Sequence, residues 1–305
     1  MRRVAPILFF ILSLAVLPAH SQTLVQSVAN ACFGCGGPIT LPFPSNVGAN
    51  RTIIISTTFF YATCSNPAAG PPGVSDNIIF PGGWAGTPGT GPVMQNVCLT
   101  FGSGFLINTL WCAQTGSSSG PMTVSLSIIG SPLTSGIGGI ATEWSGLDLT
   151  QLGPGNPGCV SDPSATGSNN SGTGGTSFTT NNITTTNAND LIVASAWFYS
   201  SGNNTTLTVG APYTNRASYI CGSGVGDCAN QVSHMIAAQA VSSTGTYGAT
   251  FTGNHLATDW MTTQFAIKLA NTNTPKHAYI VKVSPGKFYQ IPWDRPRRQI
   301  LLEQT

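Results

Sequence analysis

Apolar and polar residues follow two patterns along the chain, and both predict β-strands. Residues 124–128 alternate between apolar and polar side chains, which is the period of a strand with one buried face. Residues 191–199 are apolar on both faces and predict a central strand. Residues 52–64 are β-branched and aromatic and predict a further core strand. We expect no helix.

These strands and their connections predict an all-β fold. Further strands are predicted at residues 24–28, 98–112 (as a hairpin), 137–145, 176–180, 207–209, 233–241, 247–251 and 260–269. Residues 233–241 also fit a helix, and their neighbours favour a strand. Gly, Pro, Ser and Thr dominate the long loops between the strands, as turn chemistry requires. About ten short strands of this kind predict an antiparallel two-sheet β-sandwich that is jelly-roll-like.

The first 21 residues have the form of a secretory signal peptide. Arg2 and Arg3 precede an apolar run at residues 7–17, and Ala19-His20-Ser21 offers small residues to a signal peptidase. The run is shorter than the roughly 20 residues of a membrane-spanning helix. We therefore expect cleavage after Ser21 and a protein that is secreted or held at the cell surface, without a later transmembrane segment.

Charge divides the rest of the chain into two parts. Charged residues make up only 7% of the sequence, while hydrophobic residues make up 41%. Residues 22–270 hold three basic and seven acidic residues, and residues 271–305 hold six basic and two acidic ones. We expect a β-sandwich domain over 22–270 and a basic C-terminal tail over 271–305, with a hairpin across residues 284–287. An acidic domain argues against nucleic-acid binding, because phosphates require clustered Lys and Arg.

The even number of cysteines in an exported chain predicts a disulfide framework. The eight are Cys32, Cys35, Cys64, Cys98, Cys112, Cys159, Cys221 and Cys228. Eight cysteines allow 105 pairings, and short loops favour Cys32–Cys35 and Cys221–Cys228. The Cys32-Phe-Gly-Cys35 spacing lacks both the βαβ context of a redox motif and the second close pair of a zinc site.

Four stretches resemble a loosely defined group of exported bacterial β-sandwich domains. They are residues 74–76 (Val-Ser-Asp), 142–148 (Thr-Glu-Trp-Ser-Gly-Leu-Asp), 185–193 (Thr-Thr-Asn-Ala-Asn-Asp-Leu-Ile-Val) and 245–251 followed by 264–269. The resemblance covers about residues 24–270 and implies a jelly-roll or lectin-like sandwich that binds surfaces. The chain departs from the group in its cysteines and in residues 78–84, which replace a shorter turn.

Glu143 is the candidate catalytic residue, and two roles are open to it. On a core-facing strand it could act as an acid or base if a second carboxylate lies about 5–10 Å away, as glycosidases require. Asp148 is too far along an extended strand, and Asp190 or Asp259 could approach from another strand. The other role is structural, with Glu143 paired with an arginine (Arg51 or Arg216) or accepting backbone N–H bonds.

The candidate ligand-binding residues are Trp84 and Glu143. Trp84 lies in a Gly/Pro-rich loop, where its ring could stack on a sugar face or plug the edge of the sandwich. Loop carboxylates such as Asp76 or Asp162 could hold Ca²⁺, but no spacing supports this, so we expect no metal ligand and no cofactor.

The sequence thus predicts a secreted, non-catalytic protein that binds a surface or polymer. The expected partner is an extracellular polysaccharide or a cell-surface component, as in adhesion. Two alternatives stay open: a secreted glycan hydrolase that uses Glu143, and a structural component of an extracellular coat or matrix.

Overall fold

The computed structural model describes two units of the chain. The described residues are 22–33, 38–61, 73–76, 97–101, 104–115, 119–127, 136–148, 162, 168–202, 204–221, 232–269, 279–284 and 287–291. The first unit ends at Ala270, and the second spans Asn271–Thr305. Every element in these residues is a β-strand, and every pairing between strands is antiparallel, so the all-β prediction is confirmed.

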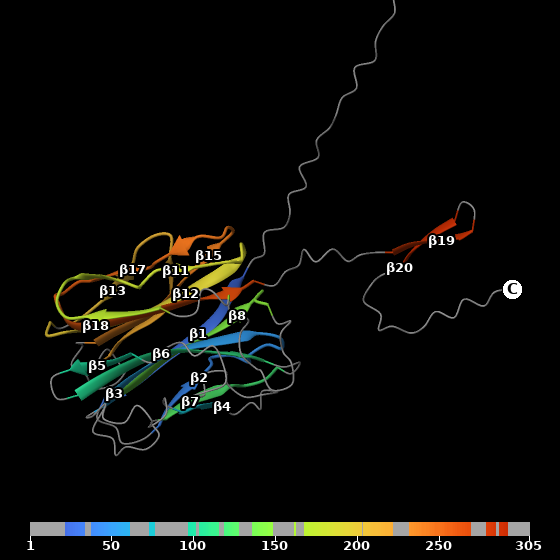
Figure 1. Ribbon diagram of the computed structural model, residues 1–305. Coiled ribbons are helices and arrows are strands. Elements are labelled where there is room, and N and C mark those ends of the chain that lie inside the picture. Colours follow the sequence, from blue (N-terminus) through green and yellow to red (C-terminus); the bar gives the residue numbers. More distant parts are fainter. Residues whose placement is uncertain are drawn as a thin grey trace, which may run out of the picture. The chain divides into compact units, whose positions relative to one another are not determined.

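The first half of the large unit contains eight strands in two sheets (Figure 1). The strands are β1 (Thr23–Phe33), β2 (Ile39–Pro42), β3 (Thr52–Tyr61), β4 (Gly73–Asp76), β5 (Val97–Phe101), β6 (Gly104–Gln114), β7 (Thr123–Ser127) and β8 (Gly136–Ser145). A five-stranded sheet has the order β1-β8-β3-β6-β5, and a three-stranded sheet has the order β2-β7-β4.

The second half contains ten strands in three sheets. They are β9 (Ser168–Gly172), β10 (Ser177–Thr179), β11 (Ile183–Thr184), β12 (Asp190–Ser200), β13 (Leu207–Val209), β14 (Thr214–Cys221), β15 (Val232–Val241), β16 (Thr246–Tyr247), β17 (Thr250–Gly253) and β18 (Ala257–Lys268). The large sheet has the order β14-β15-β12-β18-β9, and the smaller ones are β10-β17-β13 and β11-β16.

The two halves repeat one topology. If the short strands β11 and β16 are set aside, the eight remaining strands of the second half follow the order of the first: 1-8-3-6-5 in the large sheet and 2-7-4 in the small one. The central strands β3 and β12 meet face to face, since Ser56 Oγ lies 2.6 Å from Ser195 Oγ. On either side of this crossing β1 contacts β14 and β6 contacts β18. The two halves therefore pack with the central strands of their large sheets against each other.

Three apolar cores separate the sheets. The middle core lies between the two five-stranded sheets and includes Ile54, Trp144 and Trp197. The second core packs the first half's small sheet against its large one, and the third does the same in the second half. Both large sheets are thus covered on both faces, which explains why β12 is buried along nearly its whole length, as its apolar pattern predicts.

The structure does not confirm the ten-strand, two-sheet sandwich expected from the sequence. Strands β2, β4 and β14 lie where the sequence predicts no strand. A further difference lies in residues 153–189, which the sequence predicts to be a loop with one strand near 176–180. That strand is β10, and β9 and β11 flank it. Gly, Ser, Thr and Asn give these short strands no apolar period, so only pairing with β17, β16 and β18 defines them.

The second unit contains one described hairpin. β19 (Tyr279–Ser284) pairs with β20 (Lys287–Ile291), at the position where residues 284–287 predict the turn. Within the described residues no helix has the length and hydropathy to cross a membrane.

The close approach of the two large sheets depends on Gly138 of β8. A Cβ atom at this position would overlap the hydroxyl of Tyr219 and lie 3.0 Å from Thr58 Oγ1. The ring of Tyr219 is buried, and protein interiors are too closely packed for such a ring to shift without cost. Gly138→Ala should therefore lower the free energy of unfolding by about 1–3 kcal/mol, measured by urea denaturation.

Two further variants sharpen this test. Tyr219→Phe removes the overlapping hydroxyl, so the double variant should recover part of the loss. Gly120→Ala is the matched control, because a Cβ there meets no atom within 4 Å. A Gly138→Ala protein that unfolds at the wild-type urea concentration would show that the sheets do not need this glycine.

Candidate functional site: the buried carboxylate Glu143

Glu143 and Trp144 occupy opposite faces of β8, as alternation along a strand predicts. Ile137 and Ala141 lie in the core beneath the small sheet, and Glu143 shares their face. Trp144 lies in the middle core, where the guanidinium carbon of Arg216 sits 5.6 Å from its ring centroid. Of the two arginines proposed as partners for the glutamate, Arg216 therefore packs on the tryptophan instead.

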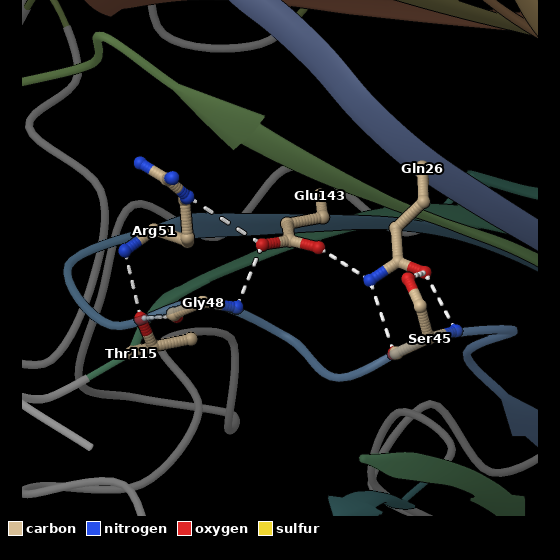
Figure 2. A network of polar contacts seen from close by, with 6 residues as sticks. All are labelled: Gln26, Ser45, Gly48, Arg51, Thr115 and Glu143. Atoms are coloured by element: carbon tan, nitrogen blue, oxygen red, sulfur yellow. Dashed lines mark hydrogen bonds and ion pairs between the residues drawn. The ribbon is translucent and has the colours of Figure 1, made fainter. Parts of the chain in front are cut away.

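The Glu143 side chain is only 1% exposed and is surrounded by donors (Figure 2). Its Oε1 accepts the backbone N–H of Gly48 at 2.9 Å and lies 3.6 Å from Nε of Arg51. Its Oε2 accepts the side-chain amide of Gln26 at 2.5 Å. The predicted partners, an arginine and a backbone N–H group, are both present as Arg51 and Gly48. Through these contacts and the one with Gln26, the carboxylate connects β1, β8 and the β2–β3 connection.

A second set of hydrogen bonds holds these donors in place. The Oε1 atom of Gln26 accepts the N–H and the hydroxyl of Ser45, which fixes the orientation of the amide. Thr115 accepts the N–H of Arg51 at 2.7 Å and donates to the carbonyl of Gly48 at 2.9 Å. The partners of Glu143 are thus preorganised by Ser45 in the β2–β3 connection and by Thr115 directly after β6 (Figure 2).

The geometry around Glu143 is that of a structural carboxylate. Both oxygens already accept hydrogen bonds, and none of the hydrogen-bond or ion-pair partners described for Glu143 is a carboxyl group. A catalytic acid or base must reach the substrate at hydrogen-bond distance, and the Glu143 side chain is only 1% exposed.

Gln264 takes a corresponding position in the second half. Thr263-Gln264-Phe265 on β18 matches Thr142-Glu143-Trp144 on β8 in order. In both segments the aromatic residue, Phe265 or Trp144, lies in the middle core. The Gln264 amide donates to the carbonyls of Asn181 and Tyr247, at 2.6 and 2.9 Å, and accepts the hydroxyl of Tyr213. A carboxylate that accepts from the chain in one half is thus replaced by an amide that donates to it in the other.

A second polar cluster lies between the two large sheets, and sequence reasoning missed it. Nε2 of His234 is 2.7 Å from Ser56 Oγ and 3.1 Å from Ser195 Oγ, and its Nδ1 is 3.4 Å from the Tyr219 hydroxyl. Serine and histidine at this distance form a nucleophile–base pair in many hydrolases. Here both serines and the histidine are fully buried, so the cluster is a cross-link between the halves.

The third polar cluster consists of carboxyl groups at the start of β12. Asp162 accepts the N–H and hydroxyl of Thr186 and the N–H of Asn187, at 2.5–2.9 Å. The Asn187 amide donates to Asp190 at 2.7 Å. Burial raises the pKa of Asp190 to about 6, against the hydrogen bond from Asn187, and the nearby Asp162 charge adds to the increase. These contacts hold the 185–190 turn.

Most of the other predicted site residues lie outside what the structure describes. Trp84 and four of the eight cysteines (Cys35, Cys64, Cys159, Cys228) lie outside the described residues, as do the side chains of Cys98 and Cys221. Cys32 and Cys112 are not free thiols. Among the side chains that the structure describes, no three His, Cys, Asp or Glu residues form a group that could hold a metal ion.

Replacement of Glu143 tests its structural role. In Glu143→Gln one side-chain atom becomes an NH₂ group that faces a donor, either Gly48 N–H or the Gln26 amide. Gln26 cannot turn its amide without losing the two hydrogen bonds that its Oε1 accepts from Ser45. An unsatisfied buried donor costs about 1–3 kcal/mol, so the free energy of unfolding in urea should fall by that amount.

Arg51→Gln is the control for this variant. Its side chain is 36% exposed, and an exposed ion pair contributes about 0–1 kcal/mol. The loss should therefore be smaller than that of Glu143→Gln. Equal losses would mean that charge pairing, and not the buried hydrogen bonds, fixes the carboxylate.

The raised pKa of Asp190 predicts a pH-dependent stability. The folded protein holds this proton up to about pH 6, while the unfolded chain loses it near 3.8. The contribution is thus fully present below pH 3.8 and is lost as the pH rises through 6. Asp190→Asn removes this loss, so its melting temperature relative to wild type should rise between pH 4 and 7.

This difference isolates Asp190 from two other groups. Burial raises the pKa of Asp259 to about 6, and it lowers the pKa of His234 to about 3. Both remain in the variant and cancel in the comparison. A difference in melting temperature that stays constant from pH 4 to 7 would refute the assignment.

Comparison with known proteins finds no match for the chain among protein-family models, curated proteins or solved structures.

Proposed function

We propose that the protein is a secreted, non-catalytic protein that binds a surface or polymer, with carbohydrate as the first candidate. The observation that carries this proposal is the state of Glu143. The candidate catalytic carboxylate is buried and serves as an acceptor for Gly48 and Gln26. This use of Glu143 favours binding over glycan hydrolysis, for which two accessible carboxylates are needed.

The exposed residues support binding to a neutral polymer. Charged residues make up 7% of the chain, so Ser, Thr, Asn and Gly must cover much of its surface. Neutral hydroxyl and amide groups suit the hydroxyl groups of sugars, whereas nucleic acid and anionic lipids require basic clusters. The expected ligand is an extracellular polysaccharide or a cell-surface component.

We further infer that each half is a jelly roll. An eight-stranded jelly roll has two sheets and two Greek keys. The orders 1-8-3-6-5 and 2-7-4 give each half eight strands in two sheets, once β11 and β16 are set aside. The inference agrees with the resemblance to exported bacterial sandwich domains. A secreted location and disulfide pairing of the eight cysteines belong to the same proposal, because disulfides form and persist in the oxidising compartments that secreted proteins enter.

Trp84 provides the test of carbohydrate binding. The mature protein should bind at least one polysaccharide on a glycan array. Trp84→Ala should weaken that binding about fivefold or more, since truncating an aromatic anchor of a binding site typically costs more than about 1 kcal/mol. Trp84→Phe keeps a ring and should retain most of the binding.

Glu143→Gln separates this function from hydrolysis. It should leave glycan binding in place at temperatures below its melting transition. Turnover of a polysaccharide that Glu143→Gln abolishes in the folded protein would establish the hydrolase instead. Binding to no polysaccharide would remove carbohydrate as the ligand.

A further inference from the structure

Three strands of the second half present a hydroxyl residue at alternate positions. They are Ser177-Phe-Thr179 on β10, Thr250-Phe-Thr252 on β17, and Thr206-Leu-Thr208, which enters β13. All six hydroxyl residues are exposed, and the apolar residue between each pair is buried. We call the exposed side of these strands the threonine face.

The register of the strands aligns the hydroxyl residues in rows. Thr252 pairs with Ser177 on one side and with Thr208 on the other, and Thr250 pairs with Thr179. Neither ladder contains a register shift. Neighbouring strands are about 4.8 Å apart, and alternate residues of one strand are about 6.8 Å apart. The threonine face therefore contains one row of three hydroxyl residues and one row of two, and Thr208 Oγ1 also donates to the carbonyl of Thr252 at 3.2 Å.

The threonine face is rigid in two respects. Behind it Phe178 and Phe251 are buried in the third core, and the ring of Phe178 stacks on Phe198 and Trp260 at 5.5 and 5.3 Å. Threonine is β-branched, so few χ1 rotamers are open to it. Little side-chain entropy is therefore lost when the hydroxyls bind a fixed array of partners.

The chemistry of the face is uniform. None of the three strands contains a charged residue, and their two aromatic residues point into the core. A sugar chain is usually held by stacking on exposed rings, which this face does not offer. A repeat of rigid, neutral hydroxyl and methyl groups instead suits a solid whose own surface repeats at the same scale.

We propose that the threonine face binds ice. Water oxygens at an ice surface form a lattice with repeats of similar size to the two strand spacings, and a threonine hydroxyl can take the place of a lattice water. The methyl groups fill the gaps between these sites, and no charged side chain holds a competing hydration shell. This proposal uses none of the residues on which the proposed carbohydrate binding rests.

The experiment uses the mature full chain and measures thermal hysteresis and partition into a growing ice hemisphere. Wild type should show both. Thr252→Lys places a long charged side chain at the centre of a complete row and should abolish both, and Thr179→Lys should do the same from the other row. Thr214→Lys, at an exposed threonine of β14, is the matched control and should retain both.

Circular dichroism melts show whether each variant is folded, and the two face variants give independent results. Trp84→Ala should leave ice binding unchanged, so failure of the carbohydrate proposal does not affect this one. Absence of wild-type protein from the ice would overturn the inference. So would full activity in both face variants. The inference would also be overturned if the face variants bound ice as wild type does and lost only their retention on a crystalline polysaccharide.

Discussion

The fold depends on covering both faces of two large sheets. Ile53, Ile54 and Ile55 of β3 are all fully buried, and β12 is buried along nearly its whole length. One sandwich covers only one face of each sheet, so each large sheet needs a second layer. The middle core supplies one covering by joining the halves, and the small sheets supply the other.

Buried polar groups then fix how these layers meet. Glu143 and Gln264 each tie the last strand of a half to a connection that leaves its small sheet. Ser56, Ser195 and His234 join the central strands where the halves cross. Such groups are costly without partners, and each one therefore specifies a single arrangement of the layers around it.

This arrangement separates the chemistry that holds the protein together from the surface it presents. The carboxylates of Glu143, Asp162 and Asp190 and the imidazole of His234 are inside. The described outer strands of the second half carry hydroxyl groups instead. In the described part of the second half, a neutral surface therefore lies over an interior that is held together by polar groups.

The sequence by itself determined the strands and their character. The apolar runs at 52–64 and 191–199 and the alternation at 124–128 predicted β3, β12 and β7, because local periodicity records how many faces are buried. Only the tertiary structure decided the duplicated topology, the strands β2, β4, β9, β11 and β14, and the partners of Glu143 and His234. Gly48 and Gln26 lie about a hundred residues from Glu143, and no local pattern encodes a contact made through pairing across sheets.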